Sequence, residues 1–220
     1  MTRKPLILPD SAHLKNITGD GRLEAPSATR NYAPILEKLG PHVPDRGVAL
    51  EIASGTGQHI AALAEAFAQV IWQPSDISAD RLESIRAWGK AAALENLAAP
   101  IALDATGDWA HAPQGVGLIY VVNLFHLIGE EEAIRVVHGM AKTLGPEGRA
   151  FIYGPFTEAG KYRSGGDEVF DRNLRAQDAL IGYKDIEWMW QQLEHAGLSK
   201  LHSYDMPANN LALVAQKPAD

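Results

Sequence analysis

The chain has 220 residues, a formal net charge of -7, 20 lysine and arginine residues and no cysteine. Its length suits one α/β domain with a full core, and its acidic balance with scattered basic residues argues against a nucleic-acid partner. The lack of cysteine excludes disulfides and thiolate zinc sites and fits a reducing cytoplasm.

Residues 1–26 are expected to form an N-terminal arm or lid, ahead of a single domain at residues 27–220. The arm has proline, glycine and aspartate without periodicity, and Gly19 and Gly21 are candidate hinges. Its apolar patch is too short for a signal peptide, and no apolar run approaches the ~20 residues of a membrane span. We therefore expect a soluble, cytoplasmic protein, monomeric or homodimeric, without a membrane partner.

Apolar residues at helical spacing predict a first helix at residues 27–39, and strands then alternate with helices. The predicted strands are 48–54, 70–76, 101–103, 118–123 and 149–153, and the predicted helices lie within 55–67, 80–94 and 130–144. This alternation is typical of a parallel sheet with helices on both faces, because each parallel pair needs a crossover. A ligand should bind beyond the carboxyl ends of the strands.

The last part of the chain departs from this alternation. After a helix at 186–195, the strands predicted at 201–206 and 211–216 are joined by a connection too short for parallel pairing. An α/β sheet ending in an antiparallel hairpin is the arrangement of class I methyltransferases. The predicted fold is therefore Rossmann-like α/β, with a mostly parallel seven-stranded sheet and a C-terminal antiparallel hairpin.

Polar and glycine residues at the strand ends indicate a cofactor site. Gly55 and Gly57 follow the first strand, where a backbone without side chains can approach a ligand, although an ordinary strand-to-helix turn has the same pattern. Asp76 ends the second strand and can accept both ribose hydroxyl protons of an adenosine. Ile60 stands where dinucleotide enzymes have their third glycine, and Glu51 suits a cationic sulfonium with an ammonium group better than a pyrophosphate.

Four further residues complete the predicted cofactor site. Asp104 ends the third strand and is a candidate acceptor for the adenine amino group, or else a turn cap. Trp109 is a candidate to stack on the ring, and Asn123 follows the fourth strand. Arg30, on the first helix, is either a partner of the methionine carboxylate or a solvated surface residue.

Several motifs together resemble one known family. They are RNYAPILEKL at 30–39, LEIASGTGQH at 50–59, WQPSD at 72–76, VVNLFHLI at 121–128, YGPF at 153–156, FDRNLRAQD at 170–178 and PANN at 207–210. In these residues, most of the chain is similar to the methyltransferase-like 26 family, although Ser164-Gly165-Gly166 stands where that family usually has Ser-Asn. The resemblance implies a class I methyltransferase fold with S-adenosylmethionine as cofactor and S-adenosylhomocysteine as product. It leaves the acceptor open.

The acceptor residues should lie above the ends of the fourth and fifth strands. His126 is a candidate general base, although a histidine inside LFHLI is often a packed core residue. Tyr153 is a candidate to position an acceptor through its hydroxyl, or to act as an aromatic lid beside Phe156, a candidate substrate contact. We treat His126 and Tyr153 as the candidate catalytic residues.

Four other residues are candidate substrate contacts. Asp171 and Arg175 are spaced to pair along a helix, but an arginine in the pocket would instead select an anionic acceptor. Asn209 and Asn210 follow a rigid proline, where hairpin chemistry explains them and a substrate contact is an additional option.

Composition and motifs leave three functional hypotheses. The leading one is a methyltransferase with a small-molecule acceptor, and the others are a protein methyltransferase and a cofactor-binding protein without transfer activity. Ile60 weakens a fourth hypothesis, an NAD-dependent oxidoreductase. The acidic run Glu130–Glu132 lies at a helix start, where negative charge favours the helix dipole, so we expect no metal.

Overall fold

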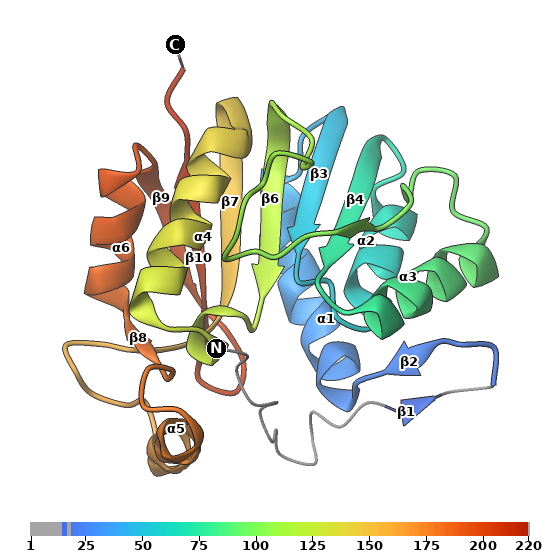
Figure 1. The fold of residues 1–220 in the computed structure, drawn as a ribbon. Coiled ribbons are helices and arrows are strands. Elements are labelled where there is room, and N and C mark those ends of the chain that lie inside the picture. Colours follow the sequence, from blue (N-terminus) through green and yellow to red (C-terminus); the bar gives the residue numbers. More distant parts are fainter. Residues whose placement is uncertain (1–14, 17–18, 220) are drawn as a thin grey trace.

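The computed structural model describes residues 15–16 and 19–219, which form a central β-sheet with helices on both faces (Figure 1). The helices are α1 (Pro26–Leu39), α2 (Gln58–Ala66), α3 (Ala79–Ala92), α4 (Glu130–Thr143), α5 (Gly165–Gln177) and α6 (Ile186–His195), with short 3-10 turns η2 (Gly40–His42) and η3 (Phe125–Leu127). The strands are β1 (Lys15–Asn16), β2 (Leu23–Glu24), β3 (Gly47–Ile52), β4 (Val70–Asp76), β5 (Ile101–Ala102), β6 (Val116–Val122), β7 (Leu144–Thr157), β8 (Lys184–Asp185), β9 (Ser199–Asp205) and β10 (Asn210–Gln216). None of the helices in these ranges is long and apolar enough to span a bilayer.

The order of the strands confirms the predicted fold class. In the described chain the main sheet has eight strands, and seven of them follow the order β5-β4-β3-β6-β7-β10-β9. The pairs from β5 to β7 are parallel, whereas β10 runs antiparallel to both β7 and β9. The sheet is thus mostly parallel with a C-terminal antiparallel hairpin. The eighth strand, β8, is not predicted by the sequence pattern, and it pairs in parallel with the end of β7.

Strand β7 begins at Leu144, five residues earlier than the predicted strand at 149–153 and at the last residue of the helix range predicted at 130–144. Two glycines explain the difference. A Cβ on Gly148 would lie 2.8 Å from the carbonyl oxygens of Gly145 and Val116, so the backbones approach closely there. The pairing with β6 also shifts register between Val116 and Leu118. Glycine in a strand is typical of such a close approach or bulge, so the segment is an irregular start of β7.

Each face of the sheet has its own apolar core, because successive side chains of a strand point to opposite faces. In β6, Leu118 and Tyr120 pack with residues of α1, α2 and α3, whereas Ile119 and Val121 pack with residues of α4 and α6. Figure 1 shows α4 and α6 in front of the sheet and the carboxyl ends of the parallel strands at its lower edge. Burial of both faces fixes the position of that edge, where a ligand site is expected.

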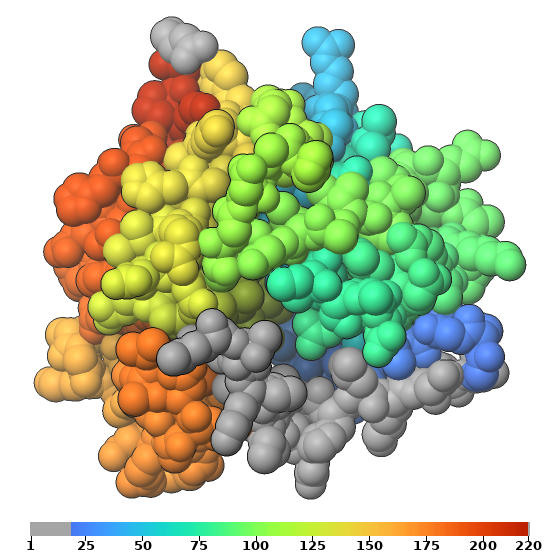
Figure 2. All heavy atoms as spheres, viewed as in Figure 1, coloured from blue at the N-terminus to red at the C-terminus, as the bar shows by residue number. Residues whose placement is uncertain are grey.

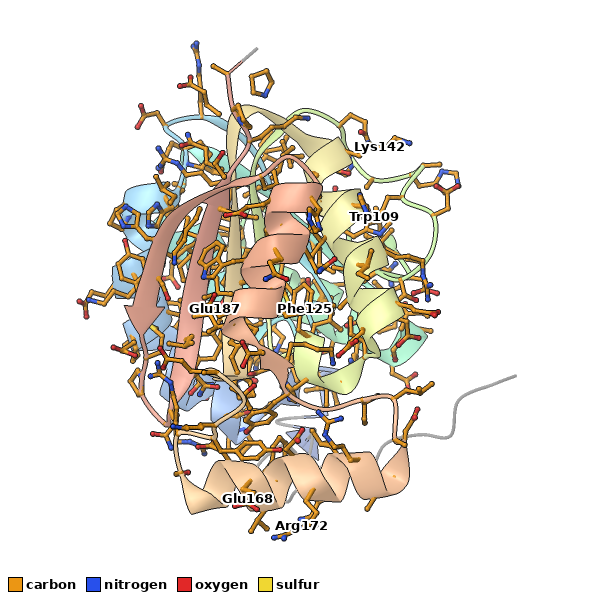
Figure 3. The ribbon with its side chains drawn as sticks, turned by 90° about the vertical axis from the view of Figure 1, so that its left-hand side faces the viewer. Trp109, Phe125, Lys142, Glu168, Arg172 and Glu187 are labelled. Carbon is orange, nitrogen blue, oxygen red and sulfur yellow. The ribbon has the colours of Figure 1, made fainter. Side chains whose placement is uncertain are left out.

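The connection from β5 to β6 passes over the α4 side of the sheet without a helix, and Figure 2 shows this green segment beside α4. Trp109 belongs to this segment and is 6% exposed. Its Nε1 donates to the Ala105 carbonyl at 2.9 Å, and a Cβ on Gly139 of α4 would lie 2.6 Å from the indole. Figure 3 shows Trp109 beside α4. The prediction that Trp109 stacks on a ligand ring is therefore wrong, because the indole fills the core against α4.

Helix α5 is inserted between β7 and β8, at the same edge as the carboxyl ends of the strands (Figure 1). The Ser164 side chain caps it by accepting a hydrogen bond from the Asp167 backbone N–H. The helix buries Asp171 and Leu174, while Figure 3 shows Glu168 and Arg172 on its outer side. The Ser-Gly-Gly departure from the resembled family thus forms the start of α5.

The described end of the N-terminal arm is held on α2 and α3 by its backbone. The Leu23 N–H donates to Ser84 Oγ at 2.8 Å, and Trp88 Nε1 donates to the Leu23 carbonyl at 3.0 Å. The Ala25 N–H donates to Gln58 Oε1 at 2.6 Å. Most of the predicted arm, residues 1–14 and 17–18, lies outside the described residues, so a lid role stays a prediction.

Acid should weaken the fold through His42, which is 4% exposed and whose Nε2 lies 3.0 Å from the Tyr204 hydroxyl. Burial, with Arg149 and His202 nearby, lowers the pKa of His42 to about 4. The folded state therefore prefers the neutral ring. The contribution of His42 to the free energy of unfolding is fully present above the unfolded pKa near 6.5 and is lost as the pH falls towards 4.

We expect His42→Gln to reduce the loss of unfolding free energy between neutral and acid pH by about 1 to 2 kcal/mol, because glutamine can still bond to Tyr204 but does not titrate. Urea denaturation of both proteins across this pH range measures the difference. Parallel stability curves would contradict the role of His42.

Candidate functional site

A cavity of about 190 Å³ opens at the carboxyl ends of β3 and β6, beside the start of α1. Its walls come from the loops that follow these strands and from three helices. They include Ala25, Ser27, Ala28, Asn31, Glu51, Ala53, Ser54, Gly55, Thr56, His59, Arg81, Val122, Asn123, Leu124 and Leu127. The structure thus brings together three of the predicted cofactor residues, Glu51, Gly55 and Asn123.

The glycine loop between β3 and α2 needs its glycines for two reasons. Gly55 and Gly57 have φ values of 59° and 88°, which L side chains rarely adopt. A Cβ on Gly57 would also lie 2.9 Å from Ile85 of α3. The loop therefore packs closely on α3 and exposes its backbone at the cavity, as the glycine pattern predicts.

Asp76 fixes this loop, and it is 1% exposed. Its Oδ2 accepts a hydrogen bond from the Gly55 N–H, and its Oδ1 accepts one from the Ser78 N–H, both at 2.9 Å. The Arg81 guanidinium lies 3.6 Å from Oδ2. A carboxylate has about four lone-pair sites, so two backbone bonds leave capacity to accept ligand hydroxyls.

Glu51 is a buried carboxyl group without a complete set of partners. It is 2% exposed, and its Oε2 has no hydrogen-bond partner. Burial raises the pKa of Glu51 to about 8, and the nearby Asp76 carboxylate adds to the rise. Glu51 is therefore mostly protonated at neutral pH, and a cation placed at its free oxygen would favour the ionised form.

His59 and Tyr120 continue the polar wall of the cavity. His59 Nδ1 lies 2.7 Å from the Tyr120 hydroxyl. Burial lowers the pKa of His59 to about 4, and burial together with nearby Glu51 raises the pKa of Tyr120 well above its usual range. At neutral pH this wall is uncharged, so a charged ligand group would bring its own charge into a desolvated site.

Arg30 and Asp104 are among the five predicted cofactor residues that do not line the cavity, together with Gly57, Asp76 and Trp109. Arg30 is exposed, while its neighbour Asn31 lines the cavity, which corrects the assignment of Arg30 to a carboxylate contact. Asp104 is exposed, and its Oδ1 accepts hydrogen bonds from the N–H and the hydroxyl of Thr106. This is the turn-capping arrangement that the sequence left as an alternative.

On the acceptor side, Asn123 and His126 approach the same point above β7. Asn123 has a φ of 56° and lines the cavity. A Cβ built on Gly154 would lie 3.8 Å from Asn123 Oδ1 and 3.9 Å from His126 Nδ1. The missing side chain of Gly154 therefore leaves space between two polar atoms, one of which borders the cavity.

His126 is neutral and deeply buried. It is 7% exposed, its Nδ1 has no hydrogen-bond partner, and the rings of Phe170 and Tyr183 lie about 6 Å away. Burial, with the ammonium of Lys184 nearby, lowers the pKa of His126 to about 3. The imidazole thus keeps a lone pair but binds a proton weakly.

Tyr153 and Phe156 are core residues, each 2% exposed. Burial raises the pKa of Tyr153 to about 12, and its hydroxyl bonds to the Asn210 side chain. Neither residue lines the cavity next to Glu51. We therefore replace their predicted roles in acceptor binding with packing roles.

The remaining candidate substrate residues form internal bonds. Asp171 is fully buried and accepts hydrogen bonds from Arg175 Nε at 2.8 Å and the Tyr162 hydroxyl at 2.7 Å. The Asp171–Arg175 pair predicted along a helix is thus present. Asp171 has these internal partners in place of the predicted substrate contact. The amide of Asn209 donates to Asp167 of α5, and that of Asn210 donates to backbone carbonyls of its own turn, so both have structural partners.

Several residues that line the cavity are not among the predicted site residues. Asn31, Thr56, His59 and Arg81 line it, and the motif LEIASGTGQH already contains two of them. Ile77 directly follows Asp76 and is 69% exposed.

Comparisons with known proteins agree with this architecture. The family model described as a protein of unknown function, DUF938, matches residues 22–217. Similar solved structures include an O-methyltransferase family protein from Burkholderia thailandensis, with a TM-score of 0.76, 15% identity, and coverage of 88% of this chain and 57% of that chain. A putative O-methyltransferase from Nostoc punctiforme has a TM-score of 0.77 and 16% identity, over 87% and 57% of the two chains. Human N-acetylserotonin methyltransferase in complex with SAM has a TM-score of 0.72 and 13% identity, over 88% and 53%.

These solved structures share the fold of methyltransferases that use S-adenosylmethionine. This chain spans little more than half the length of each of the three. At such low identity the likeness concerns the fold alone.

The pKa of Glu51 gives a stability test of the site without any ligand. Because the folded pKa is raised to about 8 from 4.5, the folded state holds the proton more tightly, and stability falls as the pH rises through this interval. We expect Glu51→Gln to be more stable than the unchanged protein at about pH 8, by roughly 1 to 3 kcal/mol, and to lose this advantage near pH 4.5. Chemical denaturation at both pH values measures it, with the exposed Glu65→Gln as control. An equal stability difference at both values would show that Glu51 does not titrate as inferred.

Proposed function

We propose that this chain, which belongs to the DUF938 family of proteins of unknown function, is an S-adenosylmethionine-dependent methyltransferase acting on a small-molecule acceptor. The observation that carries the proposal is the buried Glu51 carboxyl, which has one unpartnered oxygen in a cavity next to a glycine loop held by Asp76. The resemblance to the methyltransferase-like 26 family and the shared fold of known methyltransferases support it.

The residues at the cavity fit this cofactor. Glu51 would hold the ammonium group, since a cation is what a buried carboxyl with a free oxygen lacks. Asp76 would accept the ribose hydroxyls with its remaining lone pairs. Ile77, exposed beside it, would cover the adenine in place of Trp109, and Asp104 is kept as a candidate partner of the adenine amino group.

When bound, the cofactor would supply a methyl group from its sulfonium to a hydroxyl acceptor, with the S–C electron pair staying on sulfur, and the acceptor would give up its hydroxyl proton. Asn123 and His126 meet above Gly154, next to the cavity, where they can orient that hydroxyl. The neutral His126 can take the proton, because an oxygen that gains a methyl group becomes strongly acidic.

A small acceptor is favoured over a protein substrate by the elements that stand around the site. The cavity is about 190 Å³ and is bordered on one side by Ala25, Ser27 and Ala28. A peptide would need an open groove across the carboxyl edge, where α5 and the start of α1 both stand (Figure 1). A cofactor-binding protein without transfer activity remains the second candidate, and it predicts the same binding but no methyl transfer.

The proposal predicts that S-adenosylhomocysteine binds and raises the melting temperature, whereas NADH does neither. Asp76→Ala should weaken S-adenosylhomocysteine binding by about 1.5 to 3 kcal/mol, the scale of hydrogen bonds to a charged group. Titration calorimetry measures both. Asp108→Ala is the matched control, because Asp108 also caps a turn but lies outside the cavity. Preference for NADH, or equal affinity of the two variants, would reject the cofactor assignment.

Binding of S-adenosylhomocysteine should also release a proton from Glu51. Its carboxyl is mostly protonated below a pKa of about 8, and the incoming ammonium group would favour the carboxylate. Affinity should therefore increase as the pH rises towards 8, and calorimetry in buffers of different ionisation enthalpy should detect the proton. Glu51→Gln should remove the release, whereas Glu65→Gln should keep it. Proton release that persists in Glu51→Gln would assign it to another group.

A further inference from the structure

The segment between α5 and α6 is buried although it is a connection. Ile181, Tyr183 and Lys184 are 0%, 7% and 4% exposed. Loops usually lie on the surface, and a buried lysine is unusual unless it is fully paired. The methyl-transfer scheme above does not use this segment, so its charge needs another explanation.

Lys184 donates two hydrogen bonds to the backbone around His126. Its Nζ lies 2.7 Å from the Ile128 carbonyl and 2.8 Å from the Gly182 carbonyl. The Gly182 N–H in turn donates to the His126 carbonyl at 3.1 Å. Lys184 also pairs with Phe156 through β8, so this residue joins the sheet to the end of η3.

Asp171 of α5 holds the other side of the segment. Its Oδ1 accepts a hydrogen bond from the Tyr183 N–H, and its Oδ2 accepts from Arg175 and Tyr162. A Cβ on Gly182 would lie 2.5 Å from Asp171 Oδ1, so only glycine fits there. Although burial pushes the pKa of Asp171 upward, the hydrogen bonds from Arg175, Tyr162 and the Tyr183 backbone lower it overall. The carboxylate is therefore charged and already paired.

The charges around His126 come from two elements. Lys184 of β8 brings a positive charge, and Asp171 of α5 brings a negative one that is bonded to Arg175. Asn123 and Gly154, which face Nδ1, carry no charge. Burial, together with Arg175, lowers the pKa of Lys184 to about 8, while Glu130 and Glu132 at the start of α4 act to raise it, so Lys184 is mostly charged at neutral pH. Burial is the larger cause of the low pKa of His126, and the charge of Lys184 adds to it.

We propose that Lys184 is a positioning residue for His126: its buried ammonium, bonded to the Ile128 and Gly182 carbonyls, holds η3 and the imidazole in place. A protonated imidazole has two donors and no acceptor, so it could not receive a proton. A buried ammonium costs several kcal/mol of desolvation. Two backbone carbonyls offset part of this cost, and a neutral side chain could fill the same space without it. The catalytic meaning of the inference rests on the proposed function, whereas the effect on His126 does not.

The test is the titration of His126 followed by NMR on protein with isotopically labelled histidine, with the signal assigned through a His126→Asn variant. In the unchanged protein, His126 should stay neutral from about pH 8 down to about pH 5. The titration is continued down to about pH 3, because burial, the larger cause of the low pKa of His126, remains in every lysine variant. In Lys184→Gln, which keeps a hydrogen-bond donor but loses the charge, the pKa of His126 should rise by about one pH unit. Lys184→Arg, which keeps the charge, should leave it low.

Lys142→Met is the matched control, because Lys142 is an exposed lysine on α4, far from α5 in Figure 3. A purely structural role would affect stability but would not separate the glutamine variant from the arginine variant. An unchanged titration in Lys184→Gln, or a His126 that is already protonated near pH 6 in the unchanged protein, would overturn the proposal.

Two further measurements keep the test decisive. If the lysine variants do not fold, labelled lysine in the unchanged protein should show one ammonium group whose protons exchange slowly with water, and its absence would overturn the inference. S-adenosylhomocysteine should bind Lys184→Gln with unchanged affinity, because Lys184 does not line the cavity next to Glu51. A failed His126 titration with intact binding would therefore reject the positioning role alone, and failed binding in the unchanged protein would reject the proposed function alone.

Discussion

The hydrogen bond from the Gly55 N–H to the Asp76 carboxylate is the contact on which the site depends. It joins the loop after β3 to the end of β4, and the same carboxylate accepts the Ser78 N–H before α3 begins. A charged acceptor gives strong bonds to backbone N–H groups, more so where water is excluded. One buried side chain thus sets the position of the glycine loop and of α3, which carries Ile85 against Gly57.

A second feature is that three titratable groups at the site are uncharged near neutral pH. Burial raises the pKa of Glu51 and lowers the pKa of both His59 and His126. In a desolvated site, a charge that arrives with a ligand interacts more strongly than it would in water. The proposed chemistry, in which a cationic sulfonium becomes a neutral thioether, suits this arrangement because these three side chains carry no charge near neutral pH.

The segment between β7 and α6 adds helix α5 at the carboxyl edge of the sheet. Helix α5 buries Asp171, and the connection from α5 to α6 brings Lys184 next to η3, where His126 lies. A buried ammonium and a buried carboxylate thus lie behind a neutral imidazole, the first bonded to backbone carbonyls and the second to Arg175. Buried charges of this kind contribute little net stability, because desolvation offsets their interactions, and a role in orientation explains them better.

The sequence alone determined the fold class and the position of the glycine loop, because these depend on local periodicity and on residues with special backbone geometry. The apolar run at 118–122 predicted the buried strand β6, and Gly55, Gly57 and Asp76 were found by their spacing from the strands. Only the tertiary structure decided the direction of side chains. Trp109 packs in the core against Gly139, Arg30 points to solvent while Asn31 lines the cavity, and Lys184 lies under His126. The physical reason is that burial and partners come from residues distant in sequence, so a one-dimensional pattern places a residue at a strand end but does not say which atoms it meets.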